Sequence, residues 1–222
     1  MWICIKVATQ LLGINFQIVR GLWLIGALPR PCVSIFGGSR NFQNDEYYKK
    51  LASRAAELLV RHNISVLTGG GPGIMEAANC GAHATQHTIQ RTLKIVIEGL
   101  PFDEKPNTCP GESIFVTDFI ARKWLLIDYS VGFIIFPGGL GTMDELSDLM
   151  NLMQTGKLKR RTVVLIGVDY WAPYKTFFDQ AKTEKFLLQN TPDLLITDDI
   201  EHAVQLVINH CDECLYTNGS KK

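Results

Sequence analysis

Short apolar segments alternate with stretches of helical periodicity from Pro31 onward, and this alternation constrains the fold more than any other feature. The segments of strand character are residues 33–36, 64–67, 93–97, 114–116, 133–136, 163–166 and 194–197. The helical stretches are residues 45–62, 74–85, 118–129, 142–154, 170–189 and 200–209. Strands that alternate with helices form βαβ units, and uninterrupted apolar strands are typical of a parallel sheet buried on both faces. The sequence therefore predicts an α/β domain whose mainly parallel sheet has helices on both faces.

The first thirty residues precede this alternation, and we expect them to form an N-terminal helical extension (residues 1–30). Residues 11–24 allow a helix with a broad apolar face, which favours packing on the domain or on a partner subunit. The alternative is a helix that lies on a membrane surface. The longest uncharged stretch, residues 7–19, is shorter than the roughly 20 residues that cross a bilayer. We expect residues 31–217 to form a single domain and residues 218–222 a disordered tail.

The charge balance limits the partners that the chain can have. Lysine and arginine together number 22, as do aspartate and glutamate, so the formal net charge is zero. Nucleic acids and anionic membranes are recognised by a basic excess, which this chain lacks. We therefore expect neither as a partner. The charge balance does not exclude a local cationic pocket for one phosphate.

The six cysteines are scattered along the chain, at positions 4, 32, 80, 109, 211 and 214. Such scatter in a chain of 222 residues argues against a disulfide scaffold and favours reduced thiols in the cytoplasm. Cys211 and Cys214 form one C-x-x-C pair beside His210, but a zinc site normally needs four ligands. The alternatives are therefore a zinc site and two unpaired thiols near the C-terminus. We favour the thiols and predict no metal site.

Three glycine clusters follow predicted strands, at residues 37–38, 69–73 and 138–141. Ligands bind outside the carboxyl ends of the strands of an open parallel sheet, and glycine lets the backbone approach a ligand closely. The helix that follows each turn presents free N–H groups that suit a phosphate. Neither a Walker A loop nor a good G-x-G-x-x-G is present, which disfavours a hydride-transfer enzyme. Loop geometry alone could explain any one turn, but the set indicates a pocket the size of a nucleotide.

Two charged pairs accompany the third turn. Thr142 and Glu145 have the spacing of a capping box, which alone would explain both residues. Yet Asp144 and Glu145 are consecutive carboxylates at the ligand edge, where a developing positive charge on a sugar would account for them. Arg122 and Lys123 stand at the border of a predicted buried helix, so a solvated helix face is only one of their two interpretations.

These motifs resemble those of the LOG ("Lonely guy") family of cytokinin riboside 5′-monophosphate phosphoribohydrolases and related nucleotide nucleosidases, often labelled "lysine decarboxylase". Residues 137–145 match P-G-G-x-G-T-x-x-E, and Arg122-Lys123 match the R-K that precedes it. Residues 69–78 (GGGPGIMEAA) match a further family segment. The resemblance implies a Rossmann-like, doubly wound fold, a cytoplasmic homodimer or larger homo-oligomer, and hydrolysis of the N-glycosidic bond of a nucleoside 5′-monophosphate of the AMP or N6-modified AMP type.

The resemblance also implies the site residues. Arg122 and Glu145 become the catalytic pair, and no metal or organic cofactor is expected. The implied substrate-binding residues are Ser39, Gly70, Gly71, Lys123, Gly138, Gly139, Leu140, Gly141, Thr142 and Asp144. The chain lacks a pyridoxal-phosphate lysine motif, so the decarboxylase label finds no support in it.

Two departures from the family pattern bear on specificity. Plant members commonly have His-Glu before Arg-Lys, whereas Ile120-Ala121 stands here, and the second turn has the form G-P-G-I-M-E. Both place the chain outside the plant-type group, so a role in cytokinin biosynthesis is not implied as strongly as the hydrolysis. The alternative function is a binding protein of the same fold that carries a nucleotide or a molybdenum-cofactor-type ligand without chemistry.

Overall fold

Seven strands form one parallel sheet in the computed structural model of the chain, which describes residues 2–40, 45–85, 91–99 and 105–219. The strands are β1 (Cys32–Phe36), β2 (Ser65–Thr68), β3 (Thr92–Ile97), β4 (Glu112–Val116), β5 (Gly132–Ile135), β6 (Thr162–Ile166) and β7 (Leu195–Thr197). The helices are α1 (Trp2–Ala27), α2 (Asp45–Arg61), α3 (Ile74–Ala84), α4 (Phe119–Asp128), α5 (Leu140–Gln154), α6 (Val168–Thr183) and α7 (Ile200–Gly219). The predicted α/β architecture is confirmed.

The order of the strands creates a point where ligands can bind. The order across the sheet is β4-β3-β2-β1-β5-β6-β7, so the chain runs outward from β1 to β4 and then returns to place β5 beside β1. The direction of winding therefore reverses between β1 and β5, and the crevice outside the carboxyl ends of two such strands is the usual ligand site of a doubly wound sheet. Because Phe36 of β1 lies opposite Ile135 of β5, the glycine segments that follow these two strands emerge side by side.

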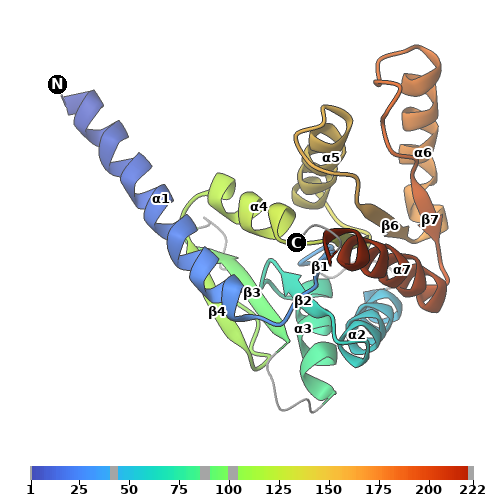
Figure 1. Cartoon of the computed structure of the whole chain (residues 1–222), viewed down its shortest axis with the longest axis horizontal. Coiled ribbons are helices and arrows are strands. Elements are labelled where there is room, and N and C mark those ends of the chain that lie inside the picture. The colour runs from blue at the N-terminus through green and yellow to red at the C-terminus, as the bar shows by residue number, and fades with distance from the viewer. Residues whose placement is uncertain (1, 41–44, 86–90, 100–104, 220–222) are drawn as a thin grey trace.

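Helices cover both faces of the sheet (Figure 1). Helices α2, α3 and α7 pack on one face, and α4, α5 and α6 pack on the other. Consecutive residues of β5 and the residue after it show the division, since Phe133 and Ile135 belong to one core while Ile134 and Phe136 belong to the other. This alternation explains why the strand is apolar without interruption, because both faces are buried.

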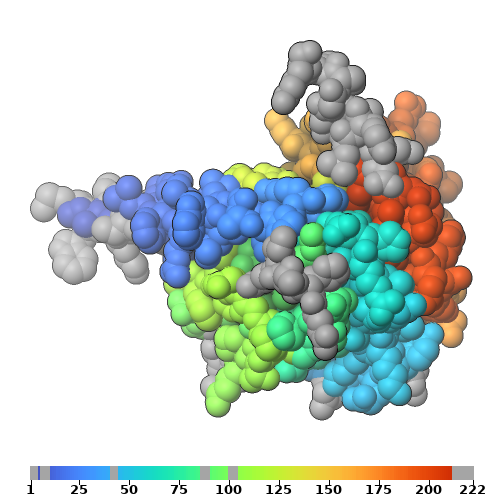
Figure 2. Space-filling model, turned by 60° about the horizontal axis from the view of Figure 1, so that its bottom comes forward, coloured from blue at the N-terminus to red at the C-terminus, as the bar shows by residue number. Residues whose placement is uncertain are grey.

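Helix α1 packs on the domain by its C-terminal half and extends beyond the body of the molecule at its other end (Figures 1 and 2). Ile25 is fully buried, and a Cβ on Gly21 would lie 2.6 Å from Leu125 of α4, so glycine permits a close helix crossing. The side chain of Gln17 exchanges two hydrogen bonds with Thr117. The predicted N-terminal helix is thus confirmed. Within the described residues, no helix combines the length and apolar character needed to cross a membrane.

Several element ends differ from the prediction. Helix α5 begins at residue 140 rather than 142. Helix α6 ends at residue 183 rather than 189, and Lys185, two residues after its end, takes a left-handed φ of 63°. Helix α7 continues to residue 219 rather than ending at residue 209. Residues 218 and 219 lie within α7, and residues 220–222, the rest of the predicted tail, lie outside the described residues.

Candidate active site

The three glycine turns meet at the carboxyl ends of β1, β2 and β5 and are hydrogen-bonded to one another. The N–H of Gly38 in the first turn donates to the Pro137 carbonyl of the third turn at 2.9 Å. The carbonyl of Gly38 accepts from the N–H of Ile74, at the end of the second turn, at 3.2 Å. The predicted meeting of the three turns at one sheet edge is therefore observed.

Two glycines are required by these contacts. Gly73 has a φ of 71°, and a Cβ there would lie 2.6 Å from the Gly38 carbonyl oxygen. A Cβ on Gly138 would lie 2.2 Å from the Thr142 hydroxyl oxygen and 2.9 Å from the Gly38 nitrogen. Any other residue at these positions would force the turns apart, since real Cβ atoms do not approach other atoms this closely.

Arg122 of α4 and Glu145 of α5 converge beside these turns. Their side chains form a largely buried ion pair, with Nη1 of Arg122 3.6 Å from Oε1 of Glu145. The Nε of Arg122 also donates to the Ile95 carbonyl of β3 at 3.2 Å, and its guanidinium lies against Gly69 of the second turn. The arginine therefore connects α5, β3 and the second turn, and only a small part of either charged side chain is exposed.

Burial sets the ionisation of Glu145. Burial raises the pKa of this carboxyl above its ordinary range, and the neighbouring carboxylate of Asp144 adds to the rise. The positive charges of Arg122 and Lys123 oppose the rise without cancelling it. A carboxylate whose pKa is raised is a stronger base than an ordinary one, which suits the role of a general base.

Lys123 joins the same two helices through a second set of ion pairs. Its Nζ lies 3.3 Å from a carboxylate oxygen of Asp144 and 3.2 Å from one of Asp148. Burial alone would lower the pKa of Lys123, but the hydrogen bonds to the two aspartates outweigh it and raise that pKa. Lys123 therefore links α4 to α5 and stabilises the relative position of the helices that carry Arg122 and Glu145.

The start of α5 is the exposed part of the site. Gly139, Leu140 and Gly141 are exposed, Leu140 to 89%, and a Cβ on Gly139 or Gly141 would meet no atom within 4 Å. The first helical hydrogen bond here runs from Met143 N–H to the Gly139 carbonyl, so the amides of residues 140–142 precede it. Such amides are available to an anionic ligand.

The capping-box interpretation of Thr142 and Glu145 is wrong. The residue that precedes α5 is Gly139, and no side chain makes a cap hydrogen bond there. Because the helix begins two residues early, Thr142 lies inside its first turn and packs against Gly138. The Glu145 carboxylate is consequently directed to Arg122 rather than back to the backbone.

The remaining predicted residues lie around this centre. Ser39 borders Gly73, with its Cα 3.4 Å from the position of a Cβ on that glycine. Gly70, with a φ of 73°, faces Lys94 and Val96 of β3 rather than the other turns.

Sequence reasoning missed two residues that hold the turns in place. The Tyr170 hydroxyl of α6 donates to the carbonyl of Gly138, and Asn107 donates to the carbonyls of Gly70 and Gly71. Neither residue stands in a recognisable motif. Both follow from the fold, since they come from a helix and a loop distant in sequence from the turns they contact.

The cysteines depart from the prediction. Cys80 of α3 and Cys109 form a disulfide bond, with their Cα atoms 5.2 Å apart, so the expectation that the thiols are all reduced is wrong. Scattered cysteines can pair when the fold brings them together, which spacing alone does not show. Cys211 is buried, and the side chain of Cys214 lies outside the described residues. Among the side chains that the structure describes, no group of three or more histidine, cysteine, aspartate or glutamate residues could hold a metal ion.

Comparisons with known proteins give both a family and a fold. A family model described as "Possible lysine decarboxylase" matches residues 75–207. A cytokinin riboside 5′-monophosphate phosphoribohydrolase of Arabidopsis thaliana is 30% identical over 156 residues, which cover 70% of this chain and 70% of the relative. A pyrimidine/purine nucleotide 5′-monophosphate nucleosidase of Escherichia coli is 28% identical over 72% of this chain, but the chain spans only 36% of the length of that enzyme. A solved molybdenum cofactor binding protein of Rippkaea orientalis superposes with a TM-score of 0.60 at 20% identity, covering 81% of this chain and 96% of the other.

Proposed function

The chain belongs to the family described as possible lysine decarboxylase, which includes the LOG phosphoribohydrolases, and from this membership we propose that it hydrolyses a nucleoside 5′-monophosphate. The products are a free base and ribose 5-phosphate. The single observation that carries the proposal is the buried Arg122–Glu145 pair at the junction of three glycine turns. These are the two residues that the resemblance implied to be catalytic, and they come from different helices.

The hydrolysis places a positive charge on the sugar, which the acidic side chain is suited to meet. As the bond between C1′ and the base nitrogen breaks, its electron pair leaves with the base and the ribose becomes oxocarbenium-like. The Glu145 carboxylate stabilises this cation and takes a proton from the attacking water, whose oxygen then bonds to C1′. The leaving base acquires a proton, so that water is consumed and no cofactor takes part.

The glycine turns and Arg122 account for binding. The exposed amides at the start of α5 hold the 5′-phosphate, with Ser39 and the second turn at its side. The guanidinium of Arg122 orients the substrate as a rigid bidentate donor. Because the phosphate is held several bonds away from the reacting carbon, its binding energy positions C1′ beside Glu145.

The carrier alternative receives less support. A molybdenum cofactor binding protein shares the fold, but at 20% identity the likeness extends to the fold alone. A carrier has no need of a buried carboxylate that faces an arginine at the ligand edge, since an unreactive anionic ligand would be repelled by it. The Arg122–Glu145 pair therefore favours hydrolysis.

The proposal includes a homodimer or larger homo-oligomer in the cytoplasm, with residues 31–217 as the nucleotide-binding domain. Large apolar side chains are exposed at the starts of the two helices that carry the charged pairs, namely Phe119, Ile120 and Leu140. A second copy of the chain that covers these side chains would also enclose the site. Light scattering coupled to gel filtration tests this assembly, and a monomer at micromolar concentration would contradict it.

Incubation with AMP tests the activity directly. Free adenine is followed by chromatography, and a panel of nucleoside monophosphates, including N6-modified AMP, then ranks the bases. Glu145→Gln should abolish adenine release and leave AMP binding largely intact. Glu57→Gln is the matched control, since Glu57 lies in ion pairs on α2 with Arg54 and Arg61 and should keep wild-type turnover.

Two results would overturn the proposal. Tight AMP binding without any base release across the panel would make the protein a carrier. Wild-type turnover in Glu145→Gln would remove Glu145 from the chemistry.

A further inference from the structure

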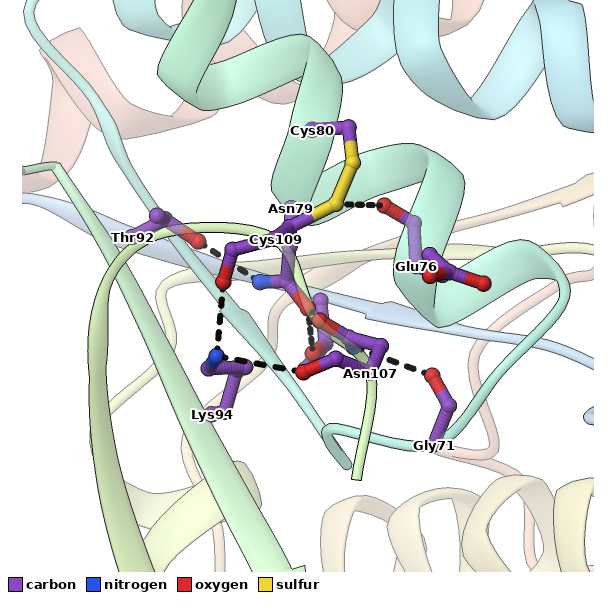
Figure 3. The surroundings of a disulfide bond; sticks show 9 residues. Gly71, Glu76, Asn79, Cys80, Thr92, Lys94, Asn107 and Cys109 are labelled. Atoms are coloured by element: carbon purple, nitrogen blue, oxygen red, sulfur yellow. Dashed lines mark hydrogen bonds between the residues drawn. A yellow bond between two sulfur atoms is a disulfide. The ribbon is translucent and has the colours of Figure 1, made fainter. Parts of the chain in front are cut away.

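The loop between β3 and β4 is fastened onto the second glycine turn by Asn107 (Figure 3). The backbone N–H of Asn107 donates to the Gly70 carbonyl at 2.9 Å, and its side-chain amide donates to the Gly71 carbonyl at 3.0 Å. The same amide donates to Oδ1 of Asn79 on α3 at 3.0 Å. One buried residue thus links the loop, the turn and the helix that follows it.

Asn79 is the centre of a buried polar network that supports the same turn. Its Oδ1 also accepts from the Thr68 hydroxyl at 2.8 Å, and its Nδ2 donates to the Thr92 hydroxyl at 2.7 Å. Thr68 in turn accepts the Gly70 N–H at 3.0 Å. A network of buried hydrogen bonds is worth most when each member is in place, because a buried polar group left without a partner is costly.

Lys94 of β3 also holds the loop, through hydrogen bonds to its backbone. This lysine is only 6% exposed, and its Nζ donates to the carbonyls of Cys109 at 2.8 Å and of Asn107 at 3.5 Å. Burial lowers its pKa. The ammonium group of Lys94 faces the negative ends of these two carbonyl dipoles, and this attraction stabilises the position of the loop.

The disulfide joins the elements that the Asn79–Asn107 contact joins. Cys80 follows Asn79 on α3, and Cys109 lies two residues after Asn107 (Figure 3). Cys109 is buried, whereas Cys80 is exposed, so the bond can be reached by a reductant from the Cys80 side. The covalent link and the polar network therefore hold the loop to α3 at adjacent points.

We propose that residues 105–111 form a clasp on the second glycine turn, in which Asn107 is the positioning residue and the Cys80–Cys109 disulfide is a redox-sensitive fastener. With the disulfide intact, Asn107 holds the carbonyls of Gly70 and Gly71 in place. With the disulfide reduced, the loop is held by hydrogen bonds alone, and the turn loses part of its support. That the clasp affects nucleotide binding rests on the function proposed above.

The redox step is an ordinary thiol–disulfide exchange with a dithiol reductant. A thiolate of the reductant attacks the sulfur of Cys80, the exposed residue of the pair, the S–S bond breaks, and Cys109 leaves as a thiolate that takes a proton. The second thiol of the reductant then displaces Cys80, which also takes a proton. The reductant is oxidised to its own disulfide, and two electrons and two protons end on the two cysteines. Disulfides in the cytoplasm are usually of this transient, redox-sensing kind.

Binding of AMP to the wild-type protein before and after dithiothreitol is the first test, with alkylation and peptide mass analysis to verify that Cys80 and Cys109 have become thiols. Reduction should raise the Kd on the order of tenfold, which corresponds to about 1.4 kcal/mol. Cys80→Ser should bind as weakly as the reduced wild type and should not respond to dithiothreitol. An unchanged Kd in verifiably reduced protein would overturn the redox part of the proposal.

Asn107→Ala tests the positioning role through the separation of KM and kcat. Asn107 holds the carbonyls of Gly70 and Gly71, whereas Arg122 is anchored by its bonds to Ile95 and Glu145. KM for AMP should therefore rise about tenfold with little change in kcat. Thr191→Ala is the matched control, since this buried threonine donates to the Gln154 side chain at the end of α5 and to the Leu188 carbonyl beyond α6. It should lower stability and leave KM unchanged. Equal effects of the two variants on KM would make Asn107 merely structural.

Amide hydrogen exchange of the ligand-free protein separates the clasp from the proposed function. Reduction should speed exchange in segments 68–71 and 105–111 and leave segments of α5 unchanged. If the oxidised protein neither binds nor hydrolyses AMP, the proposed function is refuted. If reduction still speeds exchange in these two segments of that protein, the clasp is supported all the same. Unchanged exchange in both segments would refute the clasp, whatever the activity.

Discussion

Replacing Gly69 with alanine should disable the site without altering any charged group. A Cβ on Gly69 would lie 1.8 Å from Nη2 of Arg122, whereas ordinary contact begins at 3.4 Å, so the guanidinium must retreat by about 1.6 Å. That retreat breaks the bond from Arg122 to the Ile95 carbonyl and moves the guanidinium relative to Glu145. A displacement of about 1 Å in a catalytic group can cost a factor of roughly 10² in rate. We therefore expect kcat/KM for AMP to fall about a hundredfold, which is close to 2.7 kcal/mol in the activation free energy.

The effect on stability should be small, because the obstructing atom is the far end of a flexible side chain. Alanine gains about 0.4–1 kcal/mol by restricting the unfolded chain, and the lost hydrogen bond costs about 1 kcal/mol. Thermal unfolding and steady-state hydrolysis of AMP are the two measurements. Gly13→Ala in α1 is the matched control, since its Cβ would meet no atom within 4 Å, and it should keep full activity. Full activity in Gly69→Ala as well would refute the placement of Arg122 in the reaction.

Further predictions concern the pH profile and the third turn. Glu145 must be ionised to accept a proton, so kcat/KM should fall as the pH drops through its raised pKa. Lys123 opposes that rise and Asp144 adds to it, so Lys123→Gln should move the acid limb to higher pH and Asp144→Asn should move it to lower pH; shifts in the same direction would contradict the electrostatic account. Tyr170→Phe removes the hydrogen bond to the Gly138 carbonyl, worth about 1 kcal/mol, and should raise KM for AMP about fivefold, whereas an unchanged KM would mean that Tyr170 does not support the turn.

The motifs around the candidate site could be recognised in the sequence because each is local. The third turn and the Arg122-Lys123 pair are contiguous runs, and the structure places Arg122 and Glu145 together as the resemblance implied. The ambiguity of Glu145 could not be resolved from spacing, because a capping carboxylate and an ion-paired carboxylate occupy the same position. The start of α5 decided it, since two additional residues of helix turn Thr142 inward and direct Glu145 toward α4.

The clasp could not have been predicted in the same way. Asn107 lies in a proline-containing loop, and its partners on the second turn are more than thirty residues earlier in the chain. The pairing of Cys80 with Cys109 depends on the parallel alignment of β3 and β4, which returns the loop between them to α3. No periodicity records such contacts, because they join segments that only the folded sheet brings together.

The sequence by itself determined the alternation of strands and helices, the burial of the strands on both faces and the glycines after three of them. These properties follow from side-chain periodicity and backbone freedom, which act over a few residues. Only the tertiary structure decided that the strand order reverses between β1 and β5, that the three turns bond to one another, and that a disulfide ties the loop before β4 to α3. Strand order and side-chain pairing are settled by packing between distant segments, and that packing exists only once the chain has closed around its two cores.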